Sequence, residues 1–144
     1  MLVSQIIKSK PSQAILTIKP GTTVSDASKV LSEHRIGCVV VSNDGKDVLG
    51  IISERDIVRE LGRRGPVCMS DMVDDIMTRK LVTCVAEDTV ESIMEKMSSG
   101  RFRHMPVMNG GEMVGLISIG DVVKAQLAEL SMEKDALQGM IMGH

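Results

Sequence analysis

Apolar residues recur at positions i, i+3 and i+7 in two stretches of the chain that lie 66 residues apart. The residues with this spacing are Val24, Ala27 and Leu31 in the first stretch and Val90, Ile93 and Met97 in the second. Each stripe predicts an amphipathic helix that buries one face. We expect these helices to begin at Thr22 and Asp88, each three residues before a polar side chain as in a capping box, and to end near residues 34–35 and 99–100.

Each predicted helix is followed by two short, largely aliphatic stretches with turn residues between them. The first pair covers residues 36–42 and 48–52 around Asn43-Asp44-Gly45, and the second covers residues 105–108 and 113–117 around Asn109-Gly110-Gly111. Each pair predicts a β-hairpin, because such residues tolerate the backbone that a tight turn requires. Pro106 has no N–H, so we expect its strand at a sheet edge, or Pro106 as the first residue of the strand.

Both hairpins lead directly into a second helix through the same short motif. Residues 50–58, GIISERDIV, align with residues 115–123, GLISIGDVV, and the lead-in segments 3–10 and 73–80 also match. The first of these helices is predicted over residues 54–61, with Gly62 ending it and residues 63–70 as a linker. The second is predicted from residue 119 onward.

The C-terminal helix carries apolar residues at alternating spacings of four and three. These residues are Val123, Leu127, Leu130, Leu137 and Ile141, with Lys134 interrupting the series. This is more apolar surface than one small core needs, so we expect the chain to form a homodimer. The alternative is a helix that folds back on its own domain.

Each half of the chain thus follows the order β-α-β-β-α after a short lead helix. We predict a mixed α/β (α+β) fold in which two such repeats pack about a pseudo-twofold axis. By sequence, residues 1–66 form the first repeat with its lead helix, residues 67–128 form the second repeat, and residues 129–144 form a helical extension.

Composition narrows the functions that such a fold could serve. The 144 residues include twelve Met but a single aromatic residue, Phe102, and the net charge is −2. Without a basic face or a Trp- and Tyr-based stacking surface, nucleic acid is not an expected partner. No apolar run is long enough to cross a membrane, and the His and Cys residues lack zinc-ligand spacing. An odd number of cysteines and the lack of a signal-peptide pattern lead us to expect a cytoplasmic protein with reduced thiols.

The duplicated motif resembles that of a pair of cystathionine β-synthase (CBS) domains, the Bateman module. The resemblance rests on residues 50–58, on residues 115–123 and on residues 103–107, RHMPV, before the second hairpin. It implies a non-catalytic regulatory module that binds an adenosine-containing ligand in clefts between the two repeats. AMP, ADP, ATP, NAD and S-adenosylmethionine belong to this class. The resemblance also implies a homodimer, and it requires no cofactor.

The resemblance assigns ligand contacts to residues of both repeats. They are Thr17, Ile18, Ser53, Arg55, Asp56, Thr83, Cys84, Val85, Arg103, His104, Met105, Pro106, Ser118 and Asp121. In this assignment the aspartates accept ribose hydroxyls, the basic side chains meet phosphate, and the threonine segments hold adenine through main-chain groups. The first repeat has Gly37-Cys38 in place of Arg103-His104, so it lacks that basic pair.

The residues themselves leave other interpretations open. Both S-x-x-D motifs have the spacing of a helix cap, in which case they stabilise a helix start and bind nothing. Arg103 could belong to a solvated basic corner, and Arg55 to an exposed salt bridge. The corresponding alternative function is a structural, dimerising adaptor with vestigial pockets that docks on an unidentified target protein. An enzyme is not expected, because the chain has no nucleophile–base motif, Walker loop or dinucleotide fingerprint.

Overall fold

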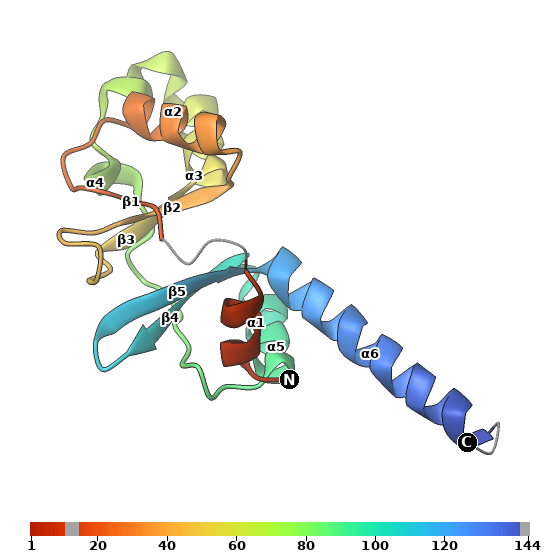
Figure 1. Ribbon diagram of the computed structural model, residues 1–144. Coiled ribbons are helices and arrows are strands. Elements are labelled where there is room, and N and C mark those ends of the chain that lie inside the picture. The colour runs from red at the N-terminus through yellow and green to blue at the C-terminus, as the bar shows by residue number, and fades with distance from the viewer. Residues whose placement is uncertain (11–14, 142–144) are drawn as a thin grey trace. The chain divides into compact units, whose positions relative to one another are not determined.

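The computed structural model describes residues 1–10 and 15–141, which fall into two compact units (Figure 1). The terminal unit contains residues 1–10, 83–108 and 115–141. The central unit contains residues 15–82 and 109–114. Each unit therefore holds most of one predicted repeat together with a segment from elsewhere in the chain.

The terminal unit combines helices with one β-hairpin. Its elements are α1 (Val3–Ser9), α5 (Val90–Gly100), β4 (His104–Asn109), β5 (Glu112–Ser118) and α6 (Ile119–Ile141). β4 pairs with β5. The turn between them has a positive φ at both Gly110 (59°) and Gly111 (87°), the backbone that a tight hairpin turn needs. The predicted hairpin is confirmed. Pro106 is the third residue of its strand, and this strand is an edge strand of a two-stranded sheet, as one of the two alternatives predicted.

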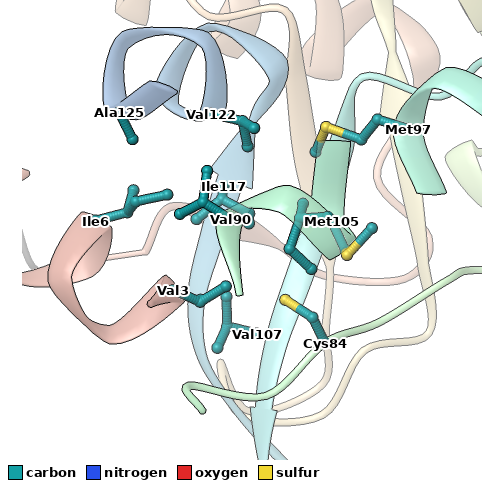
Figure 2. Packing of buried hydrophobic residues seen from close by; sticks show 11 residues of the cluster. Val3, Ile6, Cys84, Val90, Met97, Met105, Val107, Ile117, Val122 and Ala125 are labelled. Atoms are coloured by element: carbon teal, nitrogen blue, oxygen red, sulfur yellow. The ribbon is translucent and has the colours of Figure 1, made fainter. Parts of the chain in front are cut away.

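The core of the terminal unit joins α1, α5 and α6 to the hairpin (Figure 2). Its buried residues are Val3, Ile6, Cys84, Val90, Ile93, Met97, Met105, Val107, Ile117, Val122 and Ala125. Val3 and Ile6, from the first turns of the chain, share this cluster with Val122 and Ala125 of α6. The predicted apolar stripe of α5 is confirmed, since all three of its residues are buried.

The central unit is a small sheet with helices packed on it. Its elements are β1 (Thr17–Ile18), α2 (Val24–His34), β2 (Cys38–Val41), β3 (Gly50–Ser53), α3 (Glu54–Arg64), the 3-10 helix η1 (Gly65–Ser70) and α4 (Val73–Ile76). The central strand β2 runs parallel to β1 and antiparallel to β3, so Val40 pairs with both Thr17 and Ile51. The predicted stripe of α2 is confirmed as its buried face.

The lead segments pack on the opposite repeats. α1 lies in the terminal unit, where Leu2 forms a β-bridge with Thr89 just before α5. α4 lies in the central unit, where Met72 forms the equivalent bridge with Thr23 just before α2. The sequence division groups α1 with residues 1–66 instead. The compact units differ from the sequence repeats because similarity between two lead segments does not indicate which repeat each one contacts.

The glycine that opens each duplicated motif is the point where an exchanged lead segment comes closest. A Cβ atom at Gly50 would lie 2.7 Å from Met77 Sδ and 2.9 Å from the carbonyl oxygen of Thr78. At Gly115 the nearest atom would be Ile7 Cδ1, at 3.0 Å. Ile7 and Met77 hold equivalent places in the two lead segments. The glycine of the motif therefore has the same packing role in both units.

The helices α2 and α5 begin one residue later than the sequence predicts and end where it predicts. Thr23 caps α2 and Thr89 caps α5, each accepting a hydrogen bond of 3.1 Å from the main chain three residues further on. Thr22 instead donates its hydroxyl proton to Lys19 O, and Asp88 accepts from the loop before it. The predicted caps are wrong because both side chains bond back to the preceding segment.

Residues 63–70, predicted as a linker, form the end of α3 and the helix η1. Arg64, the last residue of α3, pairs with a carboxylate one turn earlier and with Asp71 just after η1. Gly65, with a φ of 76°, ends the helix rather than Gly62. The linker prediction is wrong because these ion pairs hold a segment that has no apolar periodicity of its own.

Candidate functional site

In the central unit, the S-x-x-D motif closes on itself as a helix cap. Ser53 Oγ accepts a hydrogen bond from Asp56 N (3.2 Å), and Asp56 Oδ2 accepts from Ser53 N (2.9 Å). Asp56 Oδ1 accepts from Arg59 Nη2 at 2.9 Å and from Thr78 Oγ1 at 3.4 Å. Both oxygens are therefore bonded, and only 4% of the residue is exposed. This geometry supports the capping interpretation of Asp56.

In the terminal unit, the equivalent motif is more open. Asp121 N donates to Ser118 Oγ (3.1 Å), and Asp121 Oδ2 accepts from Ser118 N (2.9 Å), so α6 starts with the same reciprocal cap. Asp121 Oδ2 also accepts from Lys10 Nζ at 3.1 Å. The Asp121 side chain is 24% exposed, against 6% for Asp56. The two aspartates are thus alike in their caps and unlike in their access to solvent.

The Asp121 carboxylate is held in its ionised form. Burial by itself would raise the pKa of this carboxyl group. The hydrogen bond from the Ser118 main chain, the Lys10 ammonium and the Ser118 hydroxyl together outweigh that effect and lower the pKa below its ordinary value. A partly exposed carboxylate at the start of a helix is an acceptor that neutral hydroxyl groups can use.

Lys10 is a residue of this site that sequence reasoning missed. Its ammonium donates to Leu116 O (2.8 Å) in addition to Asp121, so it joins the end of α1 to β5 and to the start of α6. The lead segments match at Lys10 and Lys80. That match was a signal of importance, but it did not indicate that the first lysine reaches the second repeat.

Arg103 and His104 lie at the start of β4, next to the start of α6. Arg103 O accepts a hydrogen bond of 2.8 Å from Ile119 N, the first residue of α6. The Arg103 side chain is exposed and His104 is half-buried. The structure therefore brings the predicted basic pair to the same end of the terminal unit as Ser118 and Asp121.

The segment around Cys84 lies beside β4. Cys84 N donates to Pro106 O (3.0 Å), and Cys84 O accepts from Met108 N (2.8 Å). The side chains of Cys84 and Met105 belong to the core, and burial raises the pKa of the Cys84 thiol to about 11. Any ligand contact here would have to come from the neighbours Thr83 and Val85 or from main-chain atoms.

The predicted ligand residues of the central unit are spread over β1 and the start of α3. Thr17 and Ile18 form β1, and Arg55 is exposed in the first turn of α3. A groove of about 510 Å³ also lies in this unit, between α2 and α3. It is lined by Ser28, Leu31, Ser32, Arg35, Ile36, Gly37, Glu54, Ile57 and Val58, so it includes none of the residues that the sequence assigns to a ligand.

Within residues 1–10 and 15–141 there is neither a candidate metal site nor a membrane-spanning helix. In these ranges no group of three or more His, Cys, Asp or Glu side chains could hold a metal ion. None of the helices described there is long and apolar enough to cross a membrane.

The duplication, the exchanged lead segments and the two capped S-x-x-D helix starts define a tandem-repeat α/β module. The CBS domain family matches residues 3–63 and 73–128, and the chain belongs to that family. The family predicted from the duplicated motif is therefore confirmed.

Relatives of known name share nearly the full length of the chain. The chain is 38% identical to the mitochondrial CBS domain-containing protein CBSX3 of Arabidopsis thaliana, over 98% of this chain and 72% of that protein. A crystal structure of a CBS-domain containing protein from Agrobacterium tumefaciens superposes with a TM-score of 0.83 at 38% identity, over 88% of this chain and 99% of the other. The predicted mixed α/β fold of a CBS-domain pair is thus confirmed.

Two similar structures hold adenosine-containing molecules. One is CBSX2 in complex with AMP, which has a TM-score of 0.73 at 26% identity over 88% of this chain and 96% of the other. The other is the CBS domain pair of protein MJ0100 in complex with 5′-methylthioadenosine and S-adenosyl-L-methionine, with a TM-score of 0.76 at 25% identity over 90% and 98%. CBS-domain pairs similar to this chain thus bind small molecules that contain adenosine.

Proposed function

We propose that this chain is a non-catalytic regulatory module that binds AMP or a related adenosine-containing ligand in the terminal unit. ADP, ATP and NAD belong to the same expected class, and no cofactor is required. The observation that carries the proposal is the Asp121 carboxylate, which is ionised, partly exposed and fixed at the start of α6. The AMP and S-adenosyl-L-methionine complexes of similar CBS pairs support the choice of ligand class.

The chemistry of the terminal unit suits a nucleoside phosphate. A carboxylate can accept hydrogen bonds from both hydroxyls of a ribose. The exposed Arg103 guanidinium, beside the start of α6, offers a two-pronged donor for a phosphate group, and Ser118 adds a hydroxyl. The main-chain groups of Cys84 already bond to β4, so the proposed adenine contacts fall on Thr83 and Val85.

The central unit is the weaker half of the proposal. Both carboxylate oxygens of Asp56 already accept hydrogen bonds, from its own cap, from Arg59 and from Thr78. This unit also has Gly37-Cys38 where the other has Arg103-His104. We therefore expect Thr17, Ile18, Ser53 and Arg55 to contribute less to binding than the residues around Asp121.

A thermal-shift series on the purified chain tests the proposal. AMP, ADP, ATP, NAD and S-adenosylmethionine form the test set, and GMP and inorganic phosphate are the controls that lack adenine. A specific ligand at 100 times its dissociation constant stabilises the folded state by about 2.7 kcal/mol, enough to raise the melting temperature measurably. We expect a shift with at least one adenosine compound and none with the controls.

The alternative function is a structural adaptor with vestigial pockets that docks on an unidentified target protein. The closed geometry of Asp56 and the exposed apolar side chains of α6 favour it. If no adenosine compound raises the melting temperature, the adaptor replaces the sensor. Under either function we propose a homodimer, while the cytoplasmic location stays a prediction from sequence.

A further inference from the structure

The C-terminal part of α6 presents a continuous apolar stripe to solvent. The stripe consists of Val123, Leu127, Leu130, Lys134, Leu137 and Ile141, at the alternating spacing of four and three residues. Its apolar members are 41–84% exposed. The stripe continues from Leu130 to Ile141 beyond the CBS domain match, which ends at residue 128, so this part of the surface is not part of the shared domain pair.

The stripe is on a different face of α6 from the one that packs in the terminal unit. Val122 and Ala125 are the buried residues of this helix. At about 100° per residue, the centre of the stripe is turned by roughly 130° from the centre of that buried face. The helix therefore cannot bury the stripe against its own core without giving up the contacts of Val122 and Ala125.

The exposed end of α6 needs a partner to be stable as a helix. From Leu130 to Ile141, every residue except Gly139 is exposed (Figure 1 shows this end of α6 beyond α1 and α5). A helical segment of this length is marginal in water when no apolar face is buried, and the glycine weakens it further. Burial of the stripe in an interface would supply the missing stabilisation.

We propose that the stripe of α6 pairs with the same stripe of a second copy of this chain, with the two helices antiparallel. The twofold axis of the pair lies at the level of residue 132 along the helix. In this register Val123 faces Ile141 of the other copy, and Leu127 faces Leu137. Lys134 faces Leu130 and lies next to Glu133 of the other copy, so its charge meets a carboxylate at the edge of the interface. All six positions of the stripe are then matched by an isologous contact.

The charge pattern selects this orientation over a parallel pair. A parallel in-register pair would place the two Lys134 ammonium groups opposite each other in the core. The flanking positions would then pair Glu133 with Gln138 and Gln126 with Ser131, so no ion pair would offset the repulsion. Antiparallel pairing separates the two lysines and gives each a carboxylate.

The oligomeric state of three matched variants of the full chain tests the inference, which rests on the homodimer of the proposed function. Leu127→Glu and Leu137→Glu alter the stripe at residues that are 62% and 59% exposed and that face each other's apolar side chains in the proposed register. Met132→Glu is the control, because Met132 is 60% exposed on the opposite face of α6. We expect each stripe variant to raise the dimer dissociation constant by at least about 100-fold in sedimentation analysis, because a carboxylate would be buried without a partner. The control should leave this constant unchanged.

The possible results separate the inference from the homodimer itself. If both stripe variants remain dimeric, pairing through α6 is wrong and the homodimer stands on another surface. If the unaltered chain is monomeric at micromolar concentration, the homodimer and the pairing through α6 are both wrong. The stripe would then bind a different protein.

A disulfide experiment tests the orientation. Leu127→Cys and Leu137→Cys proteins are mixed and oxidised, while the native cysteines are buried and do not compete. Antiparallel pairing predicts a cross-link between the two variants, whereas self-cross-links of each variant alone would show the parallel arrangement and overturn the register.

Discussion

Alanine substitutions at the two motif glycines should have unequal effects on stability, because the exchanged lead segments approach them differently. At Gly50 the added Cβ would meet the carbonyl oxygen of Thr78 at 2.9 Å. That oxygen accepts a hydrogen bond of 2.9 Å from Ile51 N, so it cannot retreat without breaking the bridge between Thr78 and β3. Overpacking against such a fixed group costs about 1–3 kcal/mol. Gly50→Ala should therefore lower the free energy of unfolding by an amount in this range.

At Gly115 the added Cβ would meet only the tip of a flexible side chain, Ile7 Cδ1, at 3.0 Å. This contact can relax, and alanine also restricts the unfolded chain, which stabilises by about 0.4–1 kcal/mol. The net effect of Gly115→Ala should lie within about 1 kcal/mol of zero. Ile7→Val removes Cδ1 and leaves Cγ1 at 3.3 Å. In that background Gly115→Ala should become more favourable by about 0.5–1 kcal/mol.

Urea unfolding of the single and double variants measures these differences as changes in midpoint and slope. Gly50→Ala combined with Ile7→Val is the control, and its effects should add within about 0.5 kcal/mol. Strict additivity of Ile7→Val and Gly115→Ala would refute the packing of α1 on the second repeat. Equal effects of the two glycine substitutions would refute the distinction between a fixed and a movable neighbour.

Three further outcomes follow from the site. Asp121→Asn should destabilise the fold by about 0.5–2 kcal/mol at neutral pH, from the lost helix-start charge and the ion pair with Lys10. Because the pKa of Asp121 is lowered in the folded protein, the stability difference between the unaltered chain and Asp121→Asn should persist at pH values above the ordinary carboxyl pKa of about 3.9. The difference should shrink as the pH falls through the pKa of Asp121 in the folded protein, and melting temperatures measured over an acid titration would show this. Arg103→Ala should weaken AMP binding more than adenosine binding in calorimetry, and equal losses would place Arg103 away from the phosphate. Cys84 should not react with a thiol reagent in the folded protein at neutral pH, because it is buried and its pKa is about 11, and rapid labelling would contradict this burial.

Sequence patterns were sufficient to predict the helices that bury a single face. The stripes of α2 and α5 are buried as predicted because the period of an α-helix determines which residues share a face. The cap positions were wrong by one residue, since Thr22 and Thr23 are chemically alike and only the backbone decides which hydroxyl faces the helix start. Residues 63–70 were missed because ion pairs of Arg64, rather than apolar spacing, hold them.

In the candidate site too, contacts between residues close in sequence could be predicted, and contacts with distant segments could not. Both S-x-x-D motifs were found because a cap is a contact between residues three apart. The different surroundings of Asp56 and Asp121 could not be predicted, since they depend on Thr78 and Lys10 from the exchanged lead segments. The side chain of Met105 proved to be part of the core, and residues 105–107 of β4 are all buried, a run that the alternation expected along a half-exposed strand does not predict.

Isothermal calorimetry of AMP with the unaltered chain and with Asp121→Ala tests the central claim most directly. If the carboxylate accepts ribose hydroxyls, AMP should bind the unaltered chain, and Asp121→Ala should weaken binding by about 1.5–3 kcal/mol, or roughly 10- to 150-fold. Asp56→Ala, whose carboxylate is closed within its own cap, should chiefly lower stability and change the affinity less. An AMP affinity that is the same in all three proteins would contradict the ribose assignment and leave both aspartates as helix caps.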